Sequence, residues 1–75
     1  MTNKFTTAKE IAEEYDLSYQ IINRYSDTGL LNVAFKKGNV RYYDRLHIQR
    51  RLSQISRLAR EGYSLTLIRK KILGI

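Results

Sequence analysis

Apolar residues recur every three or four positions along four stretches of the chain, and each stretch follows a residue suited to cap a helix. In the first stretch, Thr7 and Glu10 form the S/T-x-x-E pair of a capping box. The apolar positions behind them share one helical face, and they are Ala8, Ile11, Ala12 and Tyr15. This pattern predicts a helix over about residues 8 to 14.

A second helix is expected directly after the first, separated from it by a short turn at residues 15–17. Asp16 tolerates the left-handed backbone that such a turn often needs, Ser18 is a good N-cap, and Gly29 ends the helix. The inward positions of this segment are Ile21, Ile22 and Tyr25, followed by Leu30 and Leu31. The two helices and their turn predict a helix-turn-helix.

The period changes between residues 32 and 43. Two β-prone runs, 33–35 and 40–43, flank the turn signal Lys-Lys-Gly-Asn at 36–39, which predicts a short two-stranded wing. Asp44 then caps a third helix over about residues 45 to 61.

A fourth helix completes the predicted fold, because Gly62 breaks the third helix and Ser64 caps the next one. The buried positions expected in these last two helices are Ile48, Leu52, Ile55, Ala59, Leu65, Ile68 and Ile72. We therefore expect one mostly α domain over residues 1–75, a winged helix-turn-helix with four helices and a small two-stranded wing.

Size and charge restrict the functions open to this domain. A domain of 75 residues buries only about 60% of its unfolded surface, which leaves no room for a catalytic cleft beside the core. The net charge of +7, from 14 Lys+Arg against 7 Asp+Glu, favours nucleic acid or an anionic membrane surface as partner. The chain has no cysteine and nothing near the roughly 20 apolar residues of a membrane span. We expect a cytoplasmic protein that has no membrane partner.

Polar side chains on the outer face of the second helix predict direct contact with DNA. Gln and Asn form paired hydrogen bonds with adenine and Arg with guanine. A hydroxyl and free N–H groups at the start of a helix favour phosphate. The alternative is an ordinary solvated face, but the basic hairpin that follows favours the DNA-binding interpretation. The candidates are Ser18, Tyr19, Gln20, Asn23 and Arg24.

The wing supplies a second set of candidates. Lys36, Lys37 and Arg41 offer charge to phosphates or to the minor groove. Tyr42 and Tyr43 alternate faces, so we expect one to pack inward and the other to reach the DNA backbone. The alternative is a solubilising turn with Tyr43 in the core.

Other chemistry is less well supported. His47 is the only histidine and lacks a cluster of carboxylates or thiols, so we expect no metal, no cofactor and no catalysis. Arg45, Arg50 and Arg51 extend the basic footprint along the third helix, although a solvated face explains Arg50 and Arg51 equally well.

In the order of its motifs, the chain resembles the DNA-binding domain of MerR-type bacterial regulators. Asp-Leu-Ser at 16–18 stands at the family's Gly-Val-Ser turn, and Ile-Asn-Arg-Tyr-Ser at 22–26 stands at its Ile-Arg-Tyr-Tyr-Glu-like string. Gly-Leu-Leu at 29–31 matches the family's Gly-Leu exit. Val-Arg-Tyr-Tyr at 40–43 matches its wing ending Tyr-Arg-x-Tyr, and Gly-Tyr-Ser-Leu-Thr-Leu-Ile at 62–68 matches its closing Gly-Phe-Ser-Leu-x-x-Ile.

The resemblance implies binding of double-stranded DNA, with the second helix in the major groove and Arg41 and Tyr43 at contacting positions of the wing. At Asn23 and Arg24 the chain departs from the family string, so the base preference of relatives does not carry over. Full-length members continue into a dimerising helix and an effector domain. The resemblance is therefore to short members, such as excisionases and small regulators of mobile elements, without a small-molecule effector.

The predicted function is sequence-selective DNA binding at the nucleoid, as a small transcription regulator or an architectural factor. Excisionase-like control of recombination and plasmid segregation are alternative outlets. We expect a monomer in solution that binds DNA cooperatively with further copies, head to tail on direct repeats, or joins another DNA-bound protein.

Two other classes of function stay open. One is an RNA-binding protein, against which the absence of an aromatic stacking motif argues. The other is a protein-interaction module such as an antirepressor, with Leu67, Leu73 and Ile75 as an apolar end.

Overall fold

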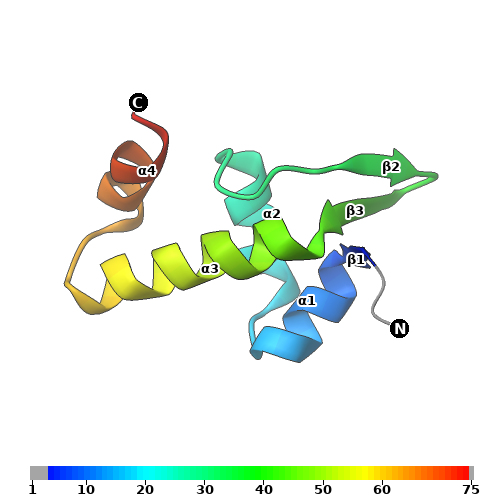
Figure 1. The fold of residues 1–75 in the computed structure, drawn as a ribbon, viewed down its shortest axis with the longest axis horizontal. Coiled ribbons are helices and arrows are strands. Elements are labelled where there is room, and N and C mark those ends of the chain that lie inside the picture. Colours follow the sequence, from blue (N-terminus) through cyan, green and yellow to red (C-terminus); the bar gives the residue numbers. More distant parts are fainter. Residues whose placement is uncertain (1–3, 75) are drawn as a thin grey trace.

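Four helices and a three-stranded antiparallel sheet form the structure, a computed structural model that describes residues 4–74 (Figure 1). In chain order they are β1 (Phe5–Thr7), α1 (Ala8–Tyr15), α2 (Tyr19–Asp27), β2 (Phe35–Lys37), β3 (Val40–Asp44), α3 (Arg45–Arg60) and α4 (Leu65–Leu73). The prediction of a mostly α winged helix-turn-helix with four helices is confirmed. Ile75, predicted as part of an apolar end, lies outside the described residues.

Each of these helices begins where a side-chain oxygen accepts a backbone N–H. Thr7 Oγ1 accepts from Glu10 N–H while the Glu10 carboxylate accepts from Thr7 N–H, which completes the capping box. The other caps are Ser18, Asp44 and Ser64. These bonds satisfy N–H groups that the helices themselves leave free. The predicted helix starts are confirmed for this reason.

The turn between α1 and α2 also follows the sequence prediction. Asp16 has φ 55° and ψ 46°, in the left-handed region. Its N–H donates to the Ala12 carbonyl, and the Leu17 N–H donates to the same carbonyl at 3.0 Å. The chain therefore reverses within a few residues, and α2 packs against α1.

The sheet has a strand that the sequence did not predict. β1 pairs with the free edge of β3, which gives the strand order β1-β3-β2 and corrects the prediction of a two-stranded wing. Three residues are too short for a recognisable alternation. The pairing is stabilised by the Phe5 ring, which lies edge-on to Phe35 with centroids 5.0 Å apart. The turn between β2 and β3 is Gly38-Asn39, shorter than the four residues predicted, so Lys36 and Lys37 belong to β2.

The core lies where the helices and the inner face of the sheet meet. Its buried apolar residues are Ala8, Ile11, Ile22, Leu30, Leu31, Tyr43, Ile48, Leu52, Ile55 and Ile68. Two positions predicted to face inward are exposed. Ile21 is 37% exposed because it lies about 100° around the helix from the buried Ile22. Ala59 is exposed, and Leu58 packs against the core instead.

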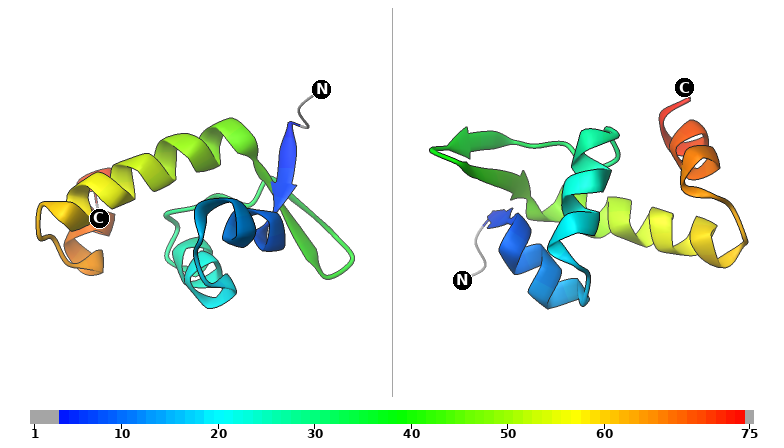
Figure 2. Two further views of the ribbon diagram at one scale, coloured as in Figure 1. Left: turned by 90° about the horizontal axis from the view of Figure 1, so that it is seen from below. Right: turned by 180° about the vertical axis from the view of Figure 1, so that it is seen from behind.

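The arrangement leaves α2 and the wing on the same side of the molecule. α3 runs along the long axis, with α1 and α2 on one side of it and α4 folded back beside its far end (Figure 2). Arg69 Nε of α4 donates to the Thr28 carbonyl at 2.7 Å. This bond ties α4 to the C-terminal end of α2, where a cation is favoured by the helix dipole.

The loop that leads from α2 to the wing is held by His47. The imidazole Nε2 accepts a hydrogen bond from the Asn32 N–H at 3.0 Å, so the ring must be neutral at this nitrogen. Burial chiefly, and then the nearby Arg51 charge, lower the pKa of His47, while Asp44 opposes the shift. The folded state therefore favours neutral His47.

We predict that acidification destabilises the protein through His47. A depressed histidine pKa gives stability that is complete above the unfolded value of about 6.5 and is lost as the pH falls below it. The free energy of unfolding, measured in urea, is expected to fall between pH 7.5 and pH 5.5. His47→Gln retains an acceptor but does not titrate. The difference in the free energy of unfolding between wild type and His47→Gln should therefore shrink as the pH falls through this interval. An unchanged difference would show that His47 titrates normally.

Candidate functional site

The outer face of α2 carries most of the predicted contacts. Tyr19 is 54% exposed, Gln20 and Arg24 are exposed, and Asn23 is half-buried. The opposite face of the helix packs inward through Ile22, which is fully buried. One short helix thus separates an apolar side from a side that is free to meet a partner.

The structure brings the wing beside this face. A hollow of about 330 Å³ lies between them, and its lining residues are Tyr19, Asn23, Asp27, Lys36, Asn39 and Arg41. Four of these were predicted as contacts, two from the helix and two from the wing. Gln20 and Arg24 do not line the hollow.

Register decides which wing side chains face α2. Lys36 is directly opposite Arg41, and Lys37 is opposite Val40. Because side chains alternate along strands, Lys36 and Arg41 share one face and Lys37 lies on the other. Like charges directly opposite each other repel and destabilise a sheet. An anion bound between them would relieve that cost.

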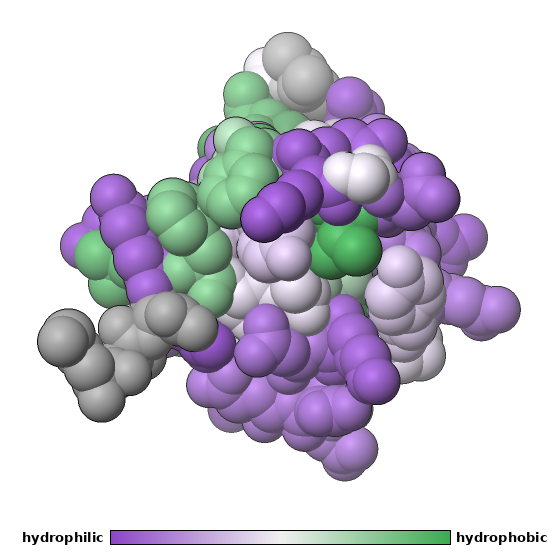
Figure 3. Space-filling view, turned by 90° about the vertical axis from the view of Figure 1, so that its right-hand side faces the viewer, coloured by the Kyte–Doolittle hydropathy of each residue, from purple (hydrophilic) through white to green (hydrophobic). Residues whose placement is uncertain are grey.

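The other face of the wing is aromatic. Phe35 stacks on Tyr42 with ring centroids 4.8 Å apart, and Phe5 meets Phe35 edge-on. Seen from the wing end, hydrophobic residues gather toward the left of the surface and hydrophilic residues cover the lower and right-hand parts (Figure 3). The two faces of the wing therefore differ in chemistry.

An acidic residue that sequence reasoning missed lies in the hollow. Asp27 Oδ1 is 3.5 Å from Arg41 Nη1, and both side chains reach solvent. Asp27 follows Asn23 and Tyr19 at spacings of four and eight residues, so helical periodicity could have identified it. Such an exposed pair contributes little stability, but it sets where the guanidinium lies.

Tyr43 is not on the surface, which corrects the prediction that it contacts the DNA backbone. Its side chain is fully buried, and its hydroxyl lies 2.6 Å from Ser26 Oγ of α2. The reason is the face on which it lies: Tyr43 points toward Ser26 of α2, whereas Tyr42, which pairs with the same strand β1, lies on the other face and stays partly exposed. The Tyr43 hydroxyl chiefly, and then Asp27, also raise the pKa of the adjacent Arg41.

Ser18 has a structural task in addition to its predicted one. Its Oγ accepts a hydrogen bond from the Ile21 N–H at 3.1 Å and caps α2. The hydroxyl proton remains available to a partner at this end of the helix. Within residues 4–74 no group of three or more His, Cys, Asp or Glu side chains could hold a metal ion.

Comparison with known families identifies the family of this chain. The family model described as MerR HTH family regulatory protein matches residues 6–74. The matched range contains the whole hollow and both helices of the helix-turn-helix. Searches of curated proteins and of solved structures gave no match. None of the helices in the described part of the chain is long and apolar enough to span a membrane.

We predict that Tyr43→Phe lowers stability without weakening DNA binding directly. Loss of one buried hydrogen bond costs about 1 kcal/mol, and Ser26 keeps its bond to the Ile22 carbonyl. Urea unfolding should show this loss. Duplex DNA affinity, measured where the variant is fully folded, should stay within about threefold of wild type, a factor that corresponds to roughly half of that energy. A large loss of affinity with unchanged stability would restore Tyr43 as a surface contact.

Asp27→Asn is expected to strengthen binding to random duplex DNA. The substitution removes a negative charge that would repel phosphates and releases Arg41, an effect worth roughly two- to fivefold in affinity, the size of an exposed charge interaction. The matched control is Glu13→Gln, an equal change of charge at an exposed residue of α1 outside the hollow. Equal gains in both variants would mean that only net charge matters, and a loss in Asp27→Asn would make Asp27 a required contact.

Proposed function

The chain belongs to the MerR HTH family of regulatory proteins, and from this premise we propose that it binds double-stranded DNA sequence-selectively. In this proposal α2 enters the major groove and the wing holds the flanking backbone or minor groove. The family is one of DNA-binding regulators, so we expect the binding to control transcription.

The observation that carries the proposal is the hollow between α2 and the wing. It places a polar helix face next to Lys36 and Arg41, two cations that the sheet register forces together. Asp27 pairs with Arg41 but not with Lys36, so part of the repulsion between the two cations remains, and a phosphate would offset it. Nucleic acid offers both groups that this surface would bind, because its phosphates lie next to the polar edges of its bases.

The dimensions of α2 suit this role. Nine residues rise about 13 Å along the helix axis, and a helix fits the major groove, which is about 12 Å wide. With Ile22 in the core, the side chains directed outward include Gln20, Asn23 and Arg24. These are residue types that form paired hydrogen bonds with adenine or guanine.

In this proposal α2 and the wing make different kinds of contact with DNA. Contacts from Gln20, Asn23 and Arg24 to base edges select sequence, whereas contacts from Lys36 and Arg41 to phosphates set position and affinity. One small domain makes few base contacts, so useful specificity needs several copies on neighbouring sites. We infer that copies assemble cooperatively on DNA, which places the protein at the nucleoid.

We predict that Arg24→Ala and Arg41→Ala weaken binding in different ways. A preferred site is first selected from randomised duplexes. Loss of a base contact by Arg24→Ala should cost about 1–3 kcal/mol on that site and little on random DNA. Arg41→Ala should weaken both duplexes by similar factors, because a phosphate contact carries no sequence information.

The control for this experiment is Lys70→Ala, an exposed cation on α4 outside the hollow. It should change both affinities by less than either test variant. The opposite pattern, with Arg24 affecting both duplexes and Arg41 only the selected one, would contradict the assigned roles of helix and wing.

A further inference from the structure

A second basic surface lies along α3. Between its first and last residues this helix carries five arginines and one histidine but no acidic residue. Arg45 pairs with Glu10 and Glu14 at 3.9 and 3.3 Å. The other four arginines form no ion pair with any residue in the range 4–74. α3 therefore holds more positive charge than the fold uses.

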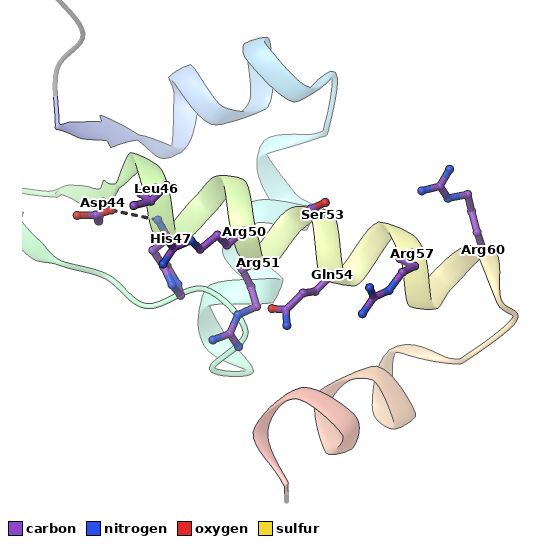
Figure 4. Close-up of a pocket in the computed structure, with 9 residues that line it drawn as sticks. All are labelled: Asp44, Leu46, His47, Arg50, Arg51, Ser53, Gln54, Arg57 and Arg60. Atoms are coloured by element: carbon purple, nitrogen blue, oxygen red, sulfur yellow. Dashed lines mark hydrogen bonds between the residues drawn. The ribbon is translucent and has the colours of Figure 1, made fainter.

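Helical periodicity gathers these charges on one side. Ile48, Leu52 and Ile55 face the core, and residues 50, 53, 57 and 60 fall on the opposite side of the helix. A hollow of about 730 Å³ runs along this side, lined by residues between Asp44 and Arg60 (Figure 4). We refer to Arg50, Ser53, Gln54, Arg57 and Arg60 as the outer face of α3.

Arg51, at the border of the outer face, points independently to an anion. Its Nη1 is buried and has no hydrogen-bond partner among the described residues. Arg51 also lines the same hollow as Arg50 and Arg57. A buried charged donor without an acceptor is costly, so a shift of the Arg51 side chain toward an anionic oxygen in the hollow would be favourable. Arginine binds phosphate oxygens with a pair of parallel hydrogen bonds.

The outer face of α3 points away from α2. The core side of α3 lines a hollow together with Tyr25 and Leu17, so α2 lies behind α3 when the outer face is viewed. The front and back views agree with this arrangement (Figures 1 and 2). The body measures only 22 and 19 Å along its shorter axes. Duplex DNA has a persistence length of about 50 nm, so one segment cannot wrap around so small a body to reach both faces.

We propose that the outer face of α3 binds the phosphate backbone of a second DNA duplex, so that the protein bridges two segments. This inference rests on the proposed binding of a first duplex by α2 and the wing. The bound chemistry is the phosphodiester backbone, read without regard to sequence. Arg50 and Arg57 are seven residues apart, about 10 Å along the helix, and span neighbouring phosphates.

The surface chemistry favours DNA over an acidic protein. Protein interfaces depend on a buried cluster of aromatic or apolar anchors. In the described part of α3, Leu46 is the only large apolar side chain counted as exposed, and it lies at one end of the row of arginines. A row of charges without an apolar centre suits a polyanion of regular spacing.

The test is a bridging assay with the purified protein. A biotinylated random duplex is fixed on beads, protein is added, and capture of a second, fluorescent duplex is measured. In parallel, fluorescence anisotropy on a single labelled duplex measures binding of the first segment. The test variant is Arg50→Gln with Arg57→Gln. The charge-matched control is Lys4→Gln with Lys70→Gln, two exposed cations outside the outer face that form no ion pair within residues 4–74.

Wild type and control should capture the second duplex, and the arginine variant should capture at least tenfold less while its single-duplex affinity changes by less than about threefold. Circular dichroism melting verifies that each variant is folded. Single-duplex binding without capture by wild type would overturn the bridging inference and leave the proposed function standing. Equal capture by wild type and the arginine variant, or equal loss in the control, would also overturn it. Absence of any duplex binding would overturn both proposals.

A competition experiment tests the alternative partner of the outer face, an acidic protein. Poly-glutamate is added at the same charge concentration as the second duplex. If it binds in an Arg50- and Arg57-dependent way while no second duplex is captured, the outer face belongs to an acidic protein and the DNA assignment is wrong.

Discussion

The relative position of α2 and the wing depends on the burial of the Tyr43 ring. Tyr43 is fully buried in β3, and its hydroxyl lies 2.6 Å from Ser26 Oγ on the inner side of α2. Since side chains two residues apart in a strand share a face, holding Tyr43 against α2 also directs Arg41 toward α2. Arg41 then meets Asp27 at 3.5 Å, and the hollow forms between them. A buried, hydrogen-bonded ring thus sets the geometry of an exposed surface.

The arginines of the protein fall into a paired and an unpaired group. Ion pairs hold two arginines, Arg41 beside α2 and Arg45 against α1, each where one element meets another. The arginines along the rest of α3 have no such partner among the described residues. The pairs fix orientation more than stability, because exposed ion pairs contribute at most about 1 kcal/mol. These unpaired arginines remain free to neutralise an external polyanion, and their position on the side of α3 that faces away from α2 is what suggests a second bound segment.

Local signals in the sequence predicted the helices well, and long-range pairing explains most of what they missed. Caps at Ser18 and Asp44 act within four residues, so they are readable from the chain alone. β1 exists only because β3 offers it an edge. The burial of Tyr43 depends on which face of β3 meets α2, a contact between residues 17 positions apart. Asp27 could have been found by helical spacing, but its contact with Arg41 needs the wing in place. The basic side of α3 was visible in composition, whereas its direction away from α2 was not.

The salt dependence of binding to random duplex DNA tests the central claim most directly. Fluorescence anisotropy across a salt series should give a logarithmic affinity that falls linearly with the logarithm of salt concentration, with a slope of about −0.9 per neutralised phosphate. Replacing Lys36 and Arg41 by Gln should make that slope shallower by an amount that corresponds to about two phosphates. A flat response in wild type would contradict DNA binding, and an unchanged slope in the variant would contradict the role given to the wing.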